Sequence, residues 1–307
     1  MLKKKKKKKL NHLILTIFKV YKDIIFIYMR DLTKLVTGDI FLFEFNSTPG
    51  IMGLIECCIR CFTDSRYSHA GFVWVDPIIP IKDIHDVCVT KNSKSSHEIK
   101  YETILDNPSY VRLKGEYIWD SAMHEIPDIN GKKHRGVQLT YLKDYIDKWG
   151  YAIDGSKMKI YKRSPVDEET YNNFNIEDKE DDLGNRISRM TWLYNKYKHV
   201  PYDFNCCDWF RACLRCRCVK RDDASLVCSA FVSMILTTCG ILPTDTNWKV
   251  ISPGELSSNM SWCVHWLRWK LKYKVDKLWD YREYRQKNPL ESHSLTFFDC
   301  KGHPKYN

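Results

Sequence analysis

The sequence lacks several patterns that would assign it to a class at once. It has no internal repeat, which excludes a solenoid or another repeat architecture. Its 13 cysteines, an odd number, lack the spacing of a disulfide framework, and 307 residues are too many for a small stapled scaffold. We therefore expect mostly free, buried thiols and a reducing compartment.

The net positive charge is small outside one short run of lysines. The formal net charge is +11, but the unbroken lysines Lys3–Lys9 supply seven of these charges and leave +4 for the rest of the chain. A mildly basic body with interspersed signs carries no strong phosphate-binding signature, so we expect no specific nucleic-acid partner. The lysine run is typical of a solvated tail that attracts any polyanion, including an anionic membrane.

An uncharged hydrophobic run long enough to cross a membrane is also missing. Residues 10–29 have the length, but they contain Lys19, Lys22 and Asp23. Each such charge near a helix centre costs about 2.5–3.5 kcal/mol to insert, which argues against a span. The segment has the pattern of an amphipathic helix, which leaves two alternatives. It packs on the protein's own domain or, together with the lysine run, makes peripheral membrane contact through residues 3–29.

What is present predicts a globular α+β protein with a sizeable core, since 44% of the residues are hydrophobic and 28% are charged. We expect an irregular polar segment at 76–110 and a helical tail beyond about residue 265, rich in aromatic and basic residues. Helical patterns cover residues 139–149, 187–197 and 225–239, the last stopping at Gly240. Strand patterns cover residues 38–45, 69–75, 115–121, 136–139 and 158–162.

Two residues carry candidate chemistry. Cys228 falls in the first turn of the predicted helix at 225–239, where free N–H groups and the helix dipole favour a thiolate and can stabilise an oxyanion. A histidine would complete such a site by accepting the proton of the thiol and returning it. His69 is the first residue of a predicted apolar strand. Without further context, the simpler interpretation of Cys228 is a buried structural thiol. That of His69 is a core histidine hydrogen-bonded to a neighbour.

Seven short motifs occur in a characteristic order. They are GDIFLF (38–43), SHAGFV (68–73), an acid at Asp120, GVQLTYL (136–142), PYDFN (201–205), VCSAFV (227–232) and SPGEL (252–256). Over roughly residues 36–258 this order resembles the circularly permuted papain-like hydrolases, relatives of NlpC-type cell-wall amidases and of lecithin–retinol acyltransferase. Poxviruses and giant DNA viruses carry such proteins.

The resemblance implies a circularly permuted papain-like fold: an antiparallel sheet or small barrel packed against helices, with helical N- and C-terminal extensions. It also implies three parts of the chain. Residues 1–35 would hold the polybasic run and amphipathic helix, 36–258 the catalytic domain, and 259–307 an aromatic and basic extension.

The same resemblance implies site residues. Cys228 corresponds to the nucleophile and His69 to the general base. The family often takes its third residue, a glutamate, from the strand after the histidine strand, and that slot holds the shorter Asp120 here. His124 and Glu125 lie close by in the sequence and are the alternatives for this orienting role.

The implied function is a cysteine hydrolase or acyltransferase. It would act on an amide or ester bond, in a lipid or a peptide, through an acyl-cysteine intermediate and without a cofactor. The alternative is a catalytically inactive papain-like scaffold associated with a membrane or a virion. The expected location is a reducing compartment such as the host cytoplasm, or a virion, with peripheral membrane association as a further alternative.

A cysteine-rich stretch at 206–218 offers a zinc hypothesis, because Cys213 and Cys216 form a C-x-x-C pair. A structural zinc site needs four ligands, usually as two spaced pairs. The stretch has no clean second pair and no histidine nearby, so we expect packed or redox-sensitive thiols and no metal. Its cysteines are Cys206, Cys207, Cys213, Cys216 and Cys218.

Overall fold

Helices and antiparallel strands occur together in this chain, so the α+β class predicted from the sequence holds. The structure, a computed structural model, describes residues 35–45, 60, 67–84, 99–123, 126–146, 158–165, 171–204, 223–257, 278–286 and 295–298.

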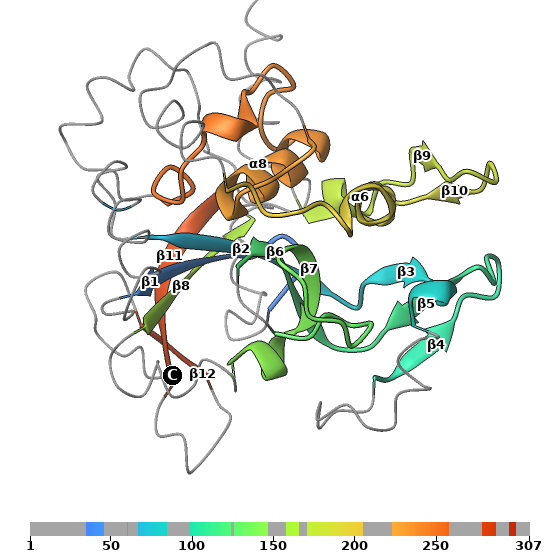
Figure 1. Ribbon diagram of the computed structural model, residues 1–307, viewed down its shortest axis with the longest axis horizontal. Coiled ribbons are helices and arrows are strands. Elements are labelled where there is room, and N and C mark those ends of the chain that lie inside the picture. Colours follow the sequence, from blue (N-terminus) through green and yellow to red (C-terminus); the bar gives the residue numbers. More distant parts are fainter. Residues whose placement is uncertain are drawn as a thin grey trace, which may run out of the picture.

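A seven-stranded antiparallel sheet forms the centre of the described residues (Figure 1). Its strand order is β12-β11-β8-β1-β2-β6-β7. The five strands predicted from alternation and β-branched content are all present, as β1, β2, β6, β7 and β8. The strands are β1 (Ile40–Phe45), β2 (His69–Val75), β6 (Glu116–Ala122), β7 (Gly136–Tyr141), β8 (Met158–Pro165), β11 (Leu278–Gln286) and β12 (Leu295–Phe298).

The sheet is covered on both faces, which explains why β2 reads as an apolar run rather than as an alternation. Successive side chains of a strand point to opposite faces. Phe72 and Trp74 belong to the core on the helix side, whereas Val73 belongs to a second core on the opposite face. A helical segment at 142–146, directly after β7, covers that opposite face.

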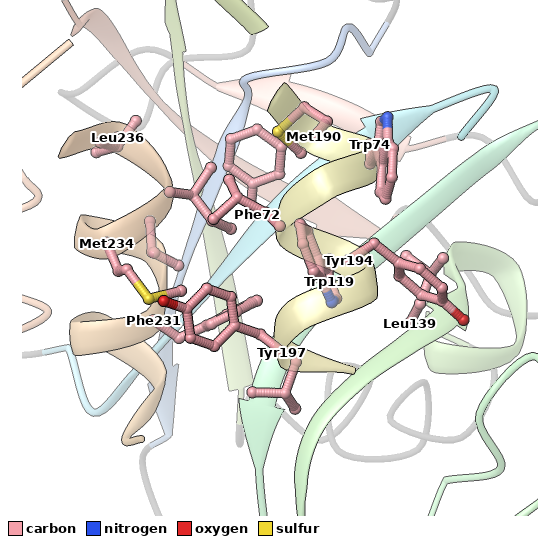
Figure 2. Close-up of a cluster of buried hydrophobic side chains, with 14 of the residues drawn as sticks. Phe72, Trp74, Trp119, Leu139, Met190, Tyr194, Tyr197, Phe231, Met234 and Leu236 are labelled. Carbon is pink, nitrogen blue, oxygen red and sulfur yellow. The ribbon is translucent and has the colours of Figure 1, made fainter. Parts of the chain in front are cut away.

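Two helices build the larger core. α8 (Cys228–Thr238) contacts β2 and β6, and α6 (Arg189–Tyr197) packs beside it. Figure 2 shows the buried side chains between them and the sheet. Trp119 meets Phe231 edge to face at 4.9 Å between ring centroids. Burial of each such side chain stabilises the fold by about 1.5–3 kcal/mol, so α8 is firmly fixed against β6.

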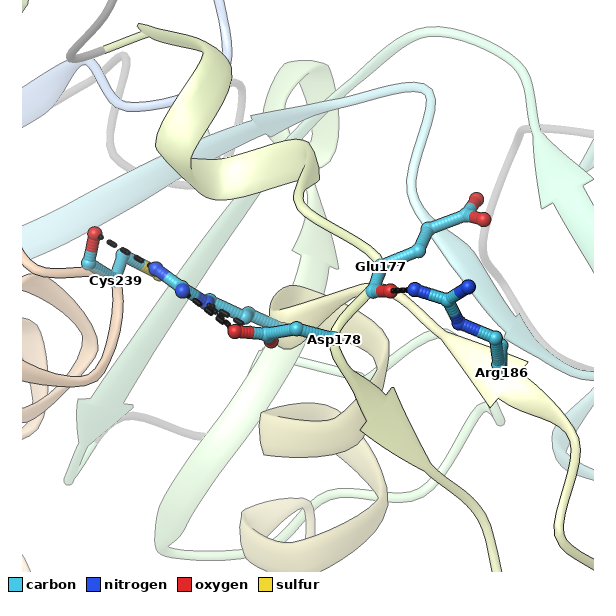
Figure 3. Close-up of polar contacts among 5 residues, drawn as sticks. Glu177, Asp178, Arg186 and Cys239 are labelled. Atoms are coloured by element: carbon cyan, nitrogen blue, oxygen red, sulfur yellow. Dashed lines mark hydrogen bonds and ion pairs between the residues drawn. The ribbon is translucent and has the colours of Figure 1, made fainter.

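The C-terminal end of α8 stops where the sequence predicts. Gly240 adopts a φ of +75°, a left-handed conformation that costs glycine little. Arg189 ties this end to the rest of the fold, because it donates to the backbone oxygen of Cys239 at 3.3 Å and pairs with Asp178 (Figure 3). The short helix η3 (Trp248–Val250) then packs back on α8.

The segment from 76 to 110 was predicted to be irregular, and this prediction is wrong for the part that is described. It contributes a three-stranded sheet of order β3-β5-β4 that projects from the central sheet (Figure 1). The strands are three or four residues long, too short for a clear alternation in the sequence. They are β3 (Ile78–Pro80), β4 (Tyr101–Thr103) and β5 (Tyr110–Leu113).

Short elements link the outlying sheet to the helices. The tip of the β9–β10 hairpin meets the outlying sheet, because the Tyr110 hydroxyl donates to Asp181 at 3.0 Å. These elements are η1 (Ile81–Asp83), η2 (Asn173–Asn175), β9 (Lys179–Glu180) and β10 (Arg186–Ile187).

The C-terminal extension departs from its prediction. A helical tail was expected, but 278–286 and 295–298 are strands, and β11 pairs with β8 at the edge of the central sheet. Pairing with β8, a strand far away in the chain, decides this. The N-terminal helix pattern at 10–29 lies outside the described residues, and the domain boundaries stay predictions. No helix in the described ranges is long and apolar enough to cross a bilayer.

Candidate active site

His69 is the first residue of β2, where the strand enters the sheet. It pairs with Phe43 of β1, and the Phe43 ring lies 5.2 Å from the imidazole between centroids. The strand's alternation puts His69 on the face of Val73, opposite the helix-side core. The exposed fraction of its side chain is 14%, so the ring is mostly buried but remains in part accessible to solvent.

Asp120 lies on the neighbouring strand, β6, and its side chain is fully buried. The register that pairs Phe72 with Trp119 sets Asp120 beside Gly71, diagonal to His69 on the same face. Asp120 Oδ2 is 2.8 Å from His69 Nε2. The strand after the histidine strand therefore does supply a carboxylate within hydrogen-bonding distance, although it is an aspartate.

Gly71 makes room for this diagonal pair. A Cβ atom there would lie 2.6 Å from the Cδ1 atom of Ile118, a distance that real Cβ atoms do not show. The same position would be 3.6 Å from the Asp120 Cβ atom. A side chain at position 71 would therefore collide with Ile118, whereas its distance from Asp120 would be an ordinary van der Waals contact.

Cys228 is the first residue of α8, and its side chain is buried as a free thiol. The residue before it, Val227, offers no side-chain cap to the helix. The first N–H groups of a helix lack intrahelical partners and carry a partial positive charge, so they favour an anion at this end. The predicted placement of Cys228 at a helix start is therefore confirmed.

Ser121, which the sequence analysis did not single out, holds the start of α8 in place. Its hydroxyl donates to the backbone oxygen of Leu226 at 2.6 Å. The N–H of Leu226 donates in turn to Pro201 at 3.1 Å. Ser121 follows Asp120 in β6 and points to the opposite face, so adjacent residues of one strand position the carboxylate and the segment that leads into Cys228.

Cys228 is near enough to act on His69, since its charge is the largest cause that raises the pKa of His69, and the three predicted residues are therefore brought together. Since Nε2 faces Asp120, Nδ1 is the ring nitrogen left for the sulfur. Burial alone would lower the pKa of His69, but the charge of Cys228 and the hydrogen bond to Asp120 outweigh it and raise the pKa to about 10. The raised pKa keeps the His69 imidazole protonated at neutral pH, beside the sulfur of Cys228.

Two tyrosines also face the site. The Tyr145 hydroxyl donates to Asp120 Oδ2 at 3.4 Å. Burial, followed by the charge of Cys228, raises the pKa of Tyr202 well above its usual value, so this phenol stays protonated. Sequence reasoning assigned neither tyrosine to the site: Tyr145 was part of a helical pattern, and Tyr202 lay in the PYDFN motif. The one available signal was that a buried tyrosine hydroxyl needs a partner.

The structure does not describe the other predicted candidates. His124 and Glu125, the alternative orienting residues, lie outside the described residues, as does the cysteine cluster at 206–218. Among the residues that the structure does describe, no three His, Cys, Asp or Glu side chains gather in a way that could hold a metal ion.

The sequence matches no known protein family and no curated protein. The chemistry of the site therefore has to be argued from its own residues.

Proposed function

We propose that this protein is a cysteine hydrolase or acyltransferase with a circularly permuted papain-like fold. A single observation supports the proposal most strongly: His69 Nε2 lies 2.8 Å from Asp120 Oδ2, and Cys228 at the start of α8 is near enough for its charge to raise the pKa of His69. A nucleophile, a base and a group that orients the base are the three parts that thiol catalysis requires. The histidine strand precedes the cysteine helix in the chain, which is the permuted order.

The first half of the reaction forms an acyl-cysteine. The Cys228 thiolate attacks the carbonyl carbon of the substrate, and the carbonyl oxygen takes up the negative charge. The N–H groups in the first turn of α8 are placed to donate to that oxygen. As the tetrahedral intermediate collapses, the bond to the leaving group breaks, and the His69 imidazolium gives its proton to the departing amine or alcohol.

The second half releases the acyl group. Neutral His69 accepts a proton from the incoming nucleophile, which attacks the thioester carbon and expels the Cys228 thiolate. Water as the nucleophile gives a carboxylic acid and hence a hydrolase. An amine or alcohol gives a new amide or ester and hence a transferase. Asp120 keeps Nε2 occupied in both halves, so that Nδ1 stays directed at the sulfur.

The proposed substrate is an amide or ester of a lipid or a peptide. The lipid alternative is supported by the basic, amphipathic sequence of residues 3–29, which suits peripheral contact with an anionic membrane.

The test is covalent labelling with a thiol-directed acyl probe, followed by peptide mapping of the modified cysteine. We expect wild type to be labelled at Cys228, Cys228→Ala to lose that labelling, and His69→Ala to react at least about 100-fold more slowly. Cys239→Ala is the matched control, since it removes the buried thiol at the other end of the same helix. Equal labelling of wild type, Cys228→Ala and His69→Ala would contradict the proposal and favour an inactive scaffold.

A further inference from the structure

Tyr145 reaches the site from the face of the sheet opposite α8. It belongs to the helical segment 142–146, which follows β7 directly, and β7 pairs with β6. Its side chain is buried, and its hydroxyl donates to Asp120 Oδ2 at 3.4 Å. This is the same carboxylate oxygen that lies 2.8 Å from His69 Nε2, so one oxygen atom serves two partners.

Phe43 fixes both of these partners from one side. Its ring centroid lies 5.2 Å from that of His69 and 5.7 Å from that of Tyr145. Phe43 is itself fully buried in the core on the face of the sheet opposite α8. Rings packed at these distances have little freedom to change rotamer, so the hydroxyl of Tyr145 is presented to Asp120 by a rigid support.

We propose that Tyr145 is a positioning residue of the active site: its hydroxyl holds the Asp120 carboxylate in the orientation that faces His69 Nε2, which directs Nδ1 at Cys228. The role in catalysis rests on the proposed function, whereas the effect on the geometry of His69 does not.

The surroundings of Tyr145 fit a donor and not a proton carrier. Burial, then the charges of Asp120 and Cys228, raise the pKa of Tyr145 well above its usual value, so the hydroxyl keeps its proton. Its 3.4 Å bond is longer than the usual distance of about 2.7–2.8 Å and is the weaker of the two contacts at Asp120 Oδ2. The titratable groups that face His69 and Tyr145 are Asp120, Cys228 and, beside the thiol, Tyr202.

The test compares wild type with Tyr145→Phe, which keeps the ring and its contact with Phe43 but removes the hydroxyl. The pKa of His69 is followed by NMR, because the hydrogen bond that His69 donates to Asp120 is one of the causes that raise it. Loss of part of that bond should lower the pKa by roughly 0.5 to 1. Tyr117→Phe is the control, a buried tyrosine whose ring packs on Tyr141 in the helix-side core.

Labelling by the acyl probe gives the second readout, and we expect Tyr145→Phe to react about 3- to 10-fold more slowly than wild type, with Tyr117→Phe unchanged. An unchanged His69 pKa in Tyr145→Phe overturns the inference, whether or not labelling occurs. Absence of Cys228 labelling in wild type refutes the proposed function instead, and a lowered His69 pKa would then still support the positioning of Asp120 by Tyr145.

Discussion

α8 carries a free thiol at each end, and the two thiols differ in almost everything but burial. Cys228 is the first residue of the helix, and Cys239 is its C-terminal cap. Cys228 faces the imidazole of His69. Cys239 lies in the apolar core, with Arg189 bound to its backbone oxygen and not to its sulfur (Figure 3).

The two ends of α8 give a buried thiol different surroundings. Burial raises the pKa of Cys239 to about 12, and the nearby Arg189 guanidinium only partly opposes this, so its thiol stays protonated. The negative end of the helix dipole at Cys239 also disfavours a thiolate. Cys228 is also buried, but it lies at the positive end of the dipole and beside a histidine that is hydrogen-bonded to Asp120. Partners, and not burial, separate the two sites.

The largest effect is expected when the acid behind His69 loses its charge. Asp120→Asn keeps the shape of the side chain but removes the anion that stabilises the imidazolium. We expect the rate of probe labelling at Cys228 to fall about 100-fold or more, measured by single-turnover kinetics. Asp128→Asn is the control, because Asp128 is also buried but accepts hydrogen bonds from the backbone of Ile129 and Leu139. An equal fall in the labelling rate in both variants would mean that the substitutions disturb folding and that Asp120 has no specific role beside His69.

A smaller but direct effect is expected on the charge state of His69. In wild type its pKa is raised from 6.5 to about 10, so the ring stays protonated at pH 8. Cys228→Ala removes the charge and hydrogen bond of the thiolate, while burial still favours the neutral ring. The pKa should therefore fall towards its ordinary value, and NMR at pH 8 should show a larger neutral fraction. Cys239→Ala should leave the pKa of His69 unchanged. A similar His69 pKa in wild type, Cys228→Ala and Cys239→Ala would mean that Cys228 does not raise it.

The smallest effect is expected at the opposite end of α8. Arg189→Gln removes the ion pair with Asp178 and the bond to Cys239, which should lower the free energy of unfolding by about 1–2 kcal/mol in urea denaturation. Labelling of Cys228 should not change. Arg186→Gln serves as the control, since Arg186 donates only to the backbone oxygen of Glu177 among its described contacts (Figure 3). A loss of labelling in Arg189→Gln would show that the two ends are coupled.

The central strands and the start of α8 were predictable because their signals are local. The apolar runs of β1 and β2 have strand length, and Gly240 ends an apolar helical pattern. The outlying sheet was missed because its strands are only three or four residues long, and β11 was missed because its partner β8 lies far away in the chain. Tyr145 and Ser121 were missed for a related reason: which atom each hydroxyl meets depends on strand register and on packing across the sheet.

The sequence by itself determined five strands of the central sheet, a thiol at the start of a helix, an imidazole at the start of a strand and an acid on the neighbouring strand. Local periodicity and helix-end chemistry are enough for that. Only the tertiary structure decided that Cys228, and not Cys239, meets His69, and that Asp120 is near enough to hold the ring. Distances of a few ångströms between residues so far apart in the chain follow from strand register and from the packing of α8 on β6, which no short stretch of sequence contains.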